Sequence, residues 1–177
     1  MDFTIRPISL DDIPAVVQIE QASRADAWSK QLFLSELKNS SSRPLVLLES
    51  ETSSIIGYIF PWFVADEIQI QNIVVAQAYR GQSLGSLLLN IALANGLEAG
   101  CIQAILEVRE SNRPAINLYH QYQFGIVGRR ESYYRDGETA LLMTAGPFNT
   151  RSDLAEYREF ISKQASRLKD QLQFQVE

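Results

Sequence analysis

The chain has 177 residues, 46% of them hydrophobic and 21% charged, which is typical of a soluble globular protein with one buried core. No apolar stretch approaches the roughly 20 residues needed to span a bilayer, and the N-terminal segment MDFTIRPISLDD carries acids and no apolar run, so neither a membrane helix nor a signal peptide is expected. The net charge of −5 argues against nucleic acid as the main partner, and the single cysteine excludes an internal disulfide and favours the cytoplasm.

The first part of the chain predicts short strands and two capped helices. Residues 3–8 predict a strand, and Ser9 is the expected N-cap of a helix with Asp11 and Asp12 in its first turn. Ser29 is the expected N-cap of a second helix. Runs of valine, isoleucine and aromatic residues then predict three further strands, over residues 44–50, 55–64 and 67–76.

The second part of the chain alternates helices and strands. A helix is predicted over residues 84–99, with Gly100 as its stop, and a strand follows over residues 101–109. The remaining elements are one helix and two strands, over residues 113–122, 124–130 and 138–145. This order of elements predicts an α/β fold.

The C-terminal residues 147–177 differ in character, and Pro147 marks the end of the last predicted strand. Apolar residues then recur at steps of three and four on a charged background, which predicts one amphipathic helix through Leu154, Tyr157, Ile161, Ala165, Leu168 and Leu172. We therefore expect a domain over residues 1–146 and a helical extension over residues 147–177. The helix could pack on its own domain, which is the commoner role of such a face, or bind a partner.

A loop with two glycines, YRGQSLG, separates the predicted strand at residues 67–76 from the predicted helix at residues 84–99. A helix N-terminus has unpaired N–H groups and a partial positive charge, and small residues allow a pyrophosphate to approach both. Arg80 can add a charge-assisted hydrogen bond. The loop has neither a Walker motif nor the spacing of a dinucleotide fingerprint. Taken alone, it equally fits a strand-to-helix turn without a ligand.

Glu107 lies in the middle of a predicted apolar strand. Because Leu106 and Val108 point to one face of that strand, the Glu107 side chain points to the other. Desolvation there would raise its pKa, as suits a general base near neutral pH. The commoner fate of a strand glutamate is to pair with a cation, such as Arg109, or to face water.

Tyr119 follows Glu107 by twelve residues, on the next predicted helix. Its phenol could protonate a basic leaving group, or the ring could simply anchor the helix in the core. Asn112 could cap that helix or meet a ligand amide. Cys101 is expected to be a small buried hydrophobe and His120 a surface or structural residue, so no metal site is expected.

Together these residues resemble the GNAT superfamily of acetyl-CoA-dependent N-acetyltransferases, over roughly residues 3–145. The resemblance implies a mixed, mainly antiparallel twisted sheet flanked by helices, with a V-shaped parting near residues 73–75 and 105–109. It implies that the strand before the glycine loop binds the pantetheine arm of acetyl-CoA and that the loop binds its pyrophosphate. The implied cofactor-binding residues are Ile73, Val74, Val75, Arg80, Gly81, Gln82, Ser83, Leu84, Gly85, Ser86, Asn112 and Tyr119.

Two residues depart from the family pattern around this loop. Ser83 occupies the first glycine position of the R-x-x-G-x-G/A motif, and Gln77 stands where proline is usual. A serine still presents its backbone N–H to a phosphate, and its hydroxyl can add a second donor.

Three segments resemble more closely the bacterial members of this family that acetylate the N-terminal alanine of the eighteenth small-subunit ribosomal protein: IEQASRADAWS, LEVRESNRPAINLYHQYQF and RRESYYRDGETALLM. This resemblance implies that Glu107 is the general base and Tyr119 the general acid. It implies peptide-binding roles for Trp28, Ser29, Tyr133 and Tyr134. The expected partner is therefore a protein N-terminus, such as that of a basic ribosomal protein. Acetylation of a lysine or a small-molecule amine, and a non-catalytic acyl-CoA-binding module, stay open as alternatives.

Overall fold

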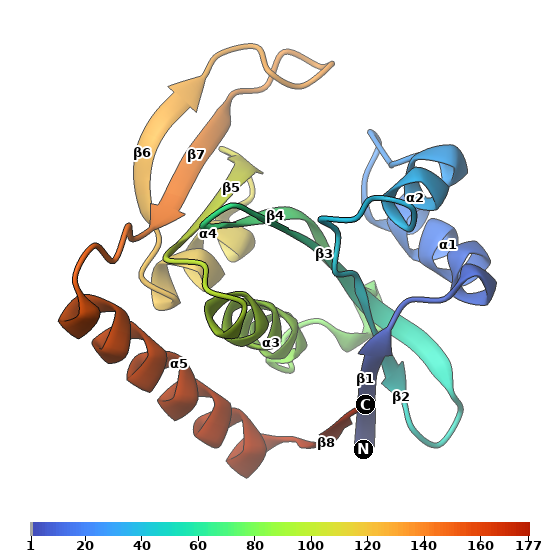
Figure 1. The fold of residues 1–177 in the computed structure, drawn as a ribbon. Coiled ribbons are helices and arrows are strands. Elements are labelled where there is room, and N and C mark those ends of the chain that lie inside the picture. The colour runs from blue at the N-terminus through green and yellow to red at the C-terminus, as the bar shows by residue number, and fades with distance from the viewer. Residues whose placement is uncertain (1) are drawn as a thin grey trace.

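The computed structural model describes residues 2–177, which form an eight-stranded sheet with helices on both faces (Figure 1). The strands are β1 (Asp2–Pro7), β2 (Leu45–Glu49), β3 (Ser54–Val64), β4 (Glu67–Val75), β5 (Gln103–Arg109), β6 (Gly125–Arg130), β7 (Ala140–Ala145) and β8 (Gln173–Val176). The α-helices are α1 (Ile13–Ser23), α2 (Lys30–Glu36), α3 (Leu84–Glu98), α4 (Arg113–Gln121) and α5 (Arg151–Gln171). Short 3-10 helices precede α1 and α3, at Leu10–Asp12 and Gln77–Tyr79.

The sheet has the strand order β6-β7-β5-β4-β3-β2-β1-β8. Its pairs are antiparallel except for β4 with β5 and β1 with β8, which are parallel. The predicted mixed, mainly antiparallel sheet is therefore confirmed.

The capping residues predicted from the sequence are also found at their helices. The Ser29 side chain accepts a hydrogen bond from the Leu32 N–H, as an N-cap does. Ser9 and Asp12 form a capping box, but the helix that they begin is first a 3-10 turn and becomes α1 only at Ile13.

Two apolar clusters fill the two faces of the sheet. The larger cluster packs α3 and α5 on one face, and the smaller packs α1 and α2 on the other (Figure 1). A Cβ atom at Gly96 would collide with the Ile68 side chain, so glycine allows α3 to lie close against β4. Within residues 2–177, no helix combines the length and the apolar character required to cross a bilayer.

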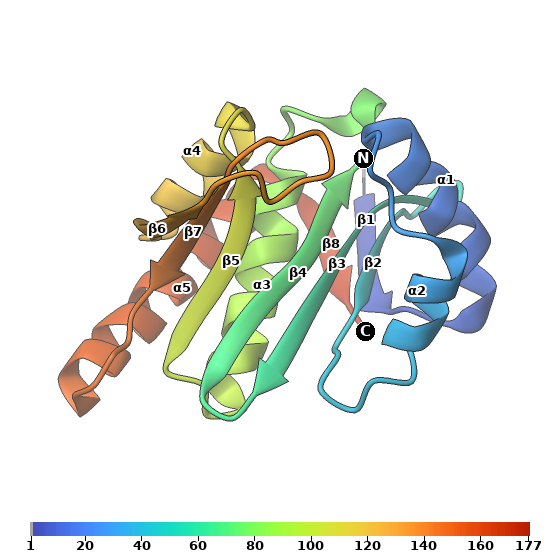
Figure 2. The same cartoon turned by 90° about the horizontal axis from the view of Figure 1, so that it is seen from above.

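The parallel pair β4–β5 separates partway along its length. Pairing runs from Glu67 with Gln103 to Ile70 with Leu106, and beyond this point the strands diverge (Figure 2). The predicted V-shaped parting is confirmed, and it leaves one edge of the last part of β4 without a partner strand.

A bulge in β4 lies at the same point. Phe60 of β3 pairs with Asn72, whereas the next residue, Pro61, pairs with Ile70, so Gln71 is an extra residue in β4. Proline cannot donate to the hydrogen-bond ladder of a sheet, and Pro61 lies at this irregularity. Because the extra residue shifts the alternation, Ile70 belongs to the α3 cluster, while Val74 belongs to the α1 cluster.

Helix α5 packs its apolar face on α3. Tyr157, Ile161 and Leu168 are buried there, and the buried Asn90 side chain of α3 donates a hydrogen bond to the Ile161 carbonyl at 3.0 Å. Strand β8 then pairs with β1, an element that the helical pattern of residues 147–177 did not predict. Leu172 continues the apolar spacing of α5, but its backbone is already extended, with φ −130° and ψ 138°.

Candidate active site

A cavity of about 670 Å³ opens at the parting of β4 and β5. Its walls come from β4, from the glycine loop and first turn of α3, from the end of β5 and from the start of α4. Of the residues predicted to bind cofactor or to catalyse, it is lined by Ile73, Val74, Val75, Arg80, Gly81, Ser83, Leu84, Gly85, Ser86, Glu107, Asn112 and Tyr119. Gln82 belongs to the same loop but does not line the cavity.

The glycine loop turns through left-handed backbone conformations into α3. Gly81 has φ +78° and Ser83 has φ +61°, so Ser83 adopts a conformation that glycine takes more readily. Ser83 is the N-cap of α3, but its hydroxyl makes no capping hydrogen bond. The first N–H groups of α3 therefore have no side-chain cap, as an anion-binding helix end requires.

Arg80 ties this loop to the neighbouring elements. Its Nε donates to the Val75 carbonyl at 3.0 Å, and its terminal nitrogen donates to the Ser23 hydroxyl at 3.3 Å. The guanidinium thus lies on the cavity wall between the end of β4 and the end of α1.

Glu107 lies on β5 and lines the cavity, on the sheet face opposite to Leu106 and Val108. The expected desolvation of its carboxylate is only partial, because the side chain is 25% exposed, and the carboxylate forms an ion pair with Arg130 of β6. The alternative of pairing with a cation is therefore confirmed, but the cation is Arg130 and not Arg109, which binds other carboxylates. Sequence reasoning missed Arg130 because β6 reaches Glu107 only across β7.

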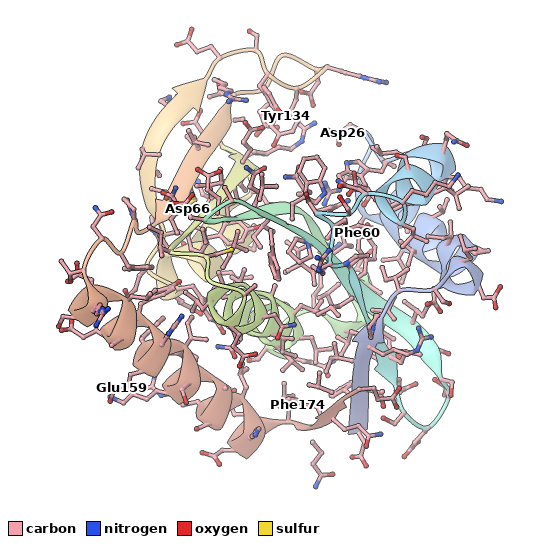
Figure 3. All side chains as sticks on the ribbon, viewed as in Figure 1. Asp26, Phe60, Asp66, Tyr134, Glu159 and Phe174 are labelled. Carbon is pink, nitrogen blue, oxygen red and sulfur yellow. The ribbon has the colours of Figure 1, made fainter. Side chains whose placement is uncertain are left out.

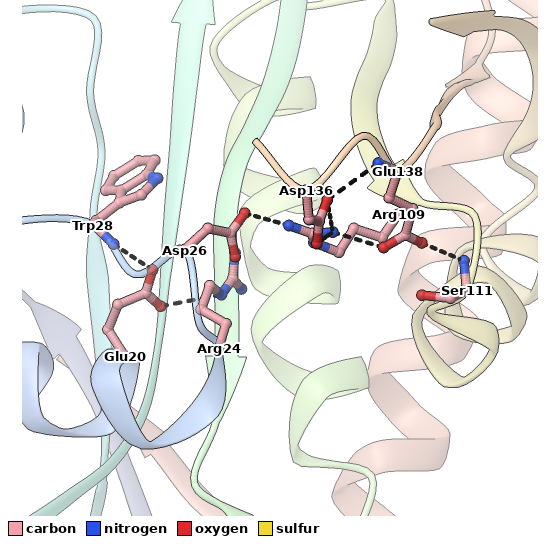
Figure 4. Close-up of polar contacts among 8 residues, drawn as sticks. All are labelled: Glu20, Arg24, Asp26, Trp28, Arg109, Ser111, Asp136 and Glu138. Carbon is pink, nitrogen blue, oxygen red and sulfur yellow. Dashed lines mark hydrogen bonds and ion pairs between the residues drawn. The ribbon is translucent and has the colours of Figure 1, made fainter. Parts of the chain in front are cut away.

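Arg109 connects two loops that flank the cavity (Figure 4). It binds Asp26 between α1 and α2 at 2.7 Å, and Asp136 and Glu138 between β6 and β7 at 2.9 and 2.6 Å. Its guanidinium also lies over the Tyr134 ring, 3.8 Å from the centroid. Burial lowers the pKa of Arg109, but the hydrogen bonds to these carboxylates raise it by more. The pKa is therefore above its ordinary value, and the side chain stays positively charged.

Tyr119 projects from α4 into the core beside the cavity. Its ring is 5% exposed and lies 5.8 Å from the Phe124 ring, and burial raises the pKa of its hydroxyl to about 12. The hydroxyl makes no hydrogen bond within residues 2–177. Asn112 caps α4, since its side-chain oxygen accepts from the Ala115 N–H at 3.3 Å.

The four residues expected to contact a peptide lie in different places. Tyr134 lines the cavity and lies close to Asp26 (Figure 3). Tyr133 packs on Tyr134 with 47% of its surface exposed and does not line the cavity. Trp28 packs against Phe33 and Phe60, and Ser29 caps α2, so neither reaches the cavity wall.

A buried carboxylate that the sequence did not indicate lies behind this wall. Glu20 of α1 is fully buried and accepts hydrogen bonds from the Tyr58 hydroxyl at 2.5 Å, the Trp28 N–H at 2.9 Å and the Asn72 amide at 3.3 Å. Arg24 pairs with it at 3.4 Å. This network joins α1 to β3 and β4 at the bulge and so holds one side of the cavity in place.

Replacing Glu20 by leucine should lower the free energy of unfolding by about 3 kcal/mol, because buried donors lose their acceptor while the volume is largely kept. Urea denaturation measures this change. Tyr58→Phe removes one donor and is the control, with an expected loss of about 1 kcal/mol. A Glu20→Leu chain no less stable than Tyr58→Phe would contradict a structural role for the network.

Cys101 and His120 take no part in this site. Cys101 is buried, and burial raises the pKa of its thiol. His120 makes a hydrogen bond through Nδ1 with the Phe124 carbonyl at 2.9 Å. In the part of the chain from residue 2 to 177, no three His, Cys, Asp or Glu side chains gather as a metal site would require.

Known proteins are similar to this chain in sequence and in fold. The model of the acetyltransferase (GNAT) family matches residues 13–125. A Bacillus subtilis protein provisionally assigned as a ribosomal protein bS18-alanine N-acetyltransferase is 38% identical over 140 residues, or 78% of this chain and 92% of its own length. The ribosomal protein bS18-alanine N-acetyltransferase of Escherichia coli K12 is 32% identical over 148 residues, or 82% and 98% of the two chains.

Solved structures agree with this relation. The crystal structure of the Escherichia coli ribosomal-protein-S18-alanine N-acetyltransferase has a TM-score of 0.74 at 32% identity and covers 81% of this chain and 96% of that one. That of Ard1 from Thermoplasma volcanium has a TM-score of 0.75 at 29% identity, with the same coverage. This chain therefore belongs to the GNAT family and is an acetyl-CoA-dependent N-acetyltransferase.

Proposed function

We propose that this enzyme acetylates the α-amino group of a protein N-terminus, and specifically an N-terminal alanine of a small-subunit ribosomal protein in the cytoplasm. The observation that carries the proposal is that Glu107 and Tyr119 line one cavity together with the glycine loop and the free edge of β4. The names of the bacterial relatives, which match most of this chain, support alanine as the acceptor residue.

The cavity wall fits acetyl-CoA along its length. The β4 edge beyond Ile70 offers backbone N–H and C=O groups to the pantetheine arm, because no strand pairs with it there. Gly81, Ser83 and the start of α3 offer N–H groups to the pyrophosphate. When bound, acetyl-CoA supplies a thioester whose carbonyl carbon accepts the amine.

Glu107 would act on the acceptor amine. A peptide α-amine has a pKa of about 7.7–8.0, so much of it is protonated at neutral pH and must lose a proton before it can attack. The Glu107 carboxylate lies on the cavity wall and can take this proton, directly or through a water. Arg130 of β6 pairs with the same carboxylate from outside β5.

Tyr119 would act on the leaving thiolate. Its hydroxyl is held in its neutral form by burial, with a pKa of about 12, and has no competing partner within residues 2–177. It can therefore donate a proton at any pH at which the enzyme works. Orientation of the amine by the cavity walls should supply much of the remaining rate enhancement.

Coenzyme A release should distinguish the acceptors. Two peptides of the same basic sequence, both containing a lysine, would be compared; one begins with a free alanine and the other with N-acetylalanine. We expect release with the free peptide alone. Equal release with both would identify lysine as the acceptor and overturn the proposal, and so would release with neither peptide when acetyl-CoA binds.

A further inference from the structure

A second, smaller cavity of about 230 Å³ lies beside the first. The two cavities share part of their walls, since Ser83, Ser86 and Gln121 line both the cavity at the β4–β5 parting and this smaller one. Its opposite wall is formed by α5, through Gln164, Arg167, Leu168 and Gln171. The C-terminal helix therefore reaches the anion-binding end of α3.

Arg167 is the cation of this second cavity. It is exposed, and within residues 2–177 no carboxylate lies within ion-pair distance of it. Two other basic residues of α5 are engaged: Lys163 pairs with Glu159 at 2.7 Å, and Arg158 donates to the Leu97 carbonyl at 2.8 Å. Arg167 thus presents an uncompensated charge to the space beside the glycine loop.

The dipole of α3 adds positive potential in the same small cavity. The first turn of α3 carries the partial positive charge of a helix N-terminus, and Ser83 at that end has no capping side-chain bond. Two positive sources on neighbouring walls of one cavity suit a phosphate group, which guanidinium binds strongly. Coenzyme A carries a pyrophosphate, which the glycine loop can bind, and a further phosphate on its ribose.

We propose that Arg167 binds a phosphate at the nucleotide end of coenzyme A, so that α5 forms part of the cofactor site. The family model ends at residue 125, so this contact comes from a segment outside it. Both the ribose phosphate and the pyrophosphate could accept hydrogen bonds from a guanidinium. Comparing coenzyme A with 3′-dephospho-coenzyme A, which lacks the ribose phosphate, distinguishes the two.

The test compares Arg167→Gln with Lys169→Gln in the full chain. Lys169 lies on the same helix and is exposed, but it does not line the cavity, so it controls for the loss of one positive charge. Calorimetry would measure the dissociation constants of coenzyme A and 3′-dephospho-coenzyme A at low salt, without any turnover. Unfolding temperatures without ligand would verify that both variants fold.

We expect Arg167→Gln to raise the dissociation constant of coenzyme A about fivefold more than Lys169→Gln does, as for an exposed charge-assisted contact. An effect confined to coenzyme A would assign Arg167 to the ribose phosphate. An equal effect on both ligands would assign it to the pyrophosphate. If Arg167→Gln and Lys169→Gln bind both ligands alike, the proposal is wrong.

Discussion

Replacing Glu107 by glutamine should lower kcat by about 10²–10⁴-fold, the usual contribution of a positioned general base, and leave the dissociation constant of acetyl-CoA unchanged. Glutamine keeps the shape of the side chain but cannot take a proton from the acceptor amine. It also gives up the ion pair with Arg130. Steady-state coenzyme A release would measure kcat, and calorimetry would measure cofactor binding.

Glu110→Gln is the matched control for this variant. Glu110 follows the same strand and also pairs with an arginine, Arg129 at 2.8 Å, but it does not line the cavity. Its kcat should stay close to that of the unmodified enzyme. A Glu107→Gln enzyme that kept its kcat would exclude Glu107 as the base and would direct attention to Asp26, which also lines the cavity.

Replacing Tyr119 by phenylalanine should lower kcat by about 10²-fold, because the ring and its packing on Phe124 remain while the proton donor is lost. The expected deficit is constant from pH 6 to 10. A hydroxyl with a pKa of about 12 stays protonated over this whole range. The unmodified enzyme would lose its proton donor only when the pH rises through this pKa. A kcat profile against pH measures the effect.

Tyr157→Phe controls for the loss of a buried tyrosine hydroxyl. The Tyr157 hydroxyl donates to the Tyr122 carbonyl at 3.0 Å and does not line either cavity. This variant should lose stability but keep kcat. If Tyr119→Phe also kept kcat, Tyr119 would be the core aromatic that its sequence pattern equally allows.

Much of the fold could be predicted from local patterns. Strand and helix bounds follow from runs of β-branched residues and from caps such as Ser29, which act over a few residues. The order strand, glycine loop, helix placed Gly81 and Ser83 at the start of α3. Alternation along β5 gave the face of Glu107, but its place in the same cavity as the glycine loop followed only from the resemblance to the GNAT family.

The electrostatic surroundings of the site could not be predicted in this way. Arg109 binds Asp26, 83 residues away along the chain, and Glu107 binds Arg130 from a strand beyond its neighbour. Such pairs depend on how the loops fold over the sheet, for which no local pattern exists. Asn72 faces Glu20 only because the bulge at Gln71 reverses the alternation of β4.

The pairing of β1 with β8 has a consequence for how the protein is made. It joins segments at opposite ends of the described chain, and the Gln175 amide donates to the Thr4 hydroxyl across 171 positions. During synthesis, β1 therefore has one open edge until residues 173–176 have left the ribosome. Open strand edges recruit other chains, and contacts of such long range form slowly. The pairing of β8 therefore closes the β1 edge only at the end of synthesis.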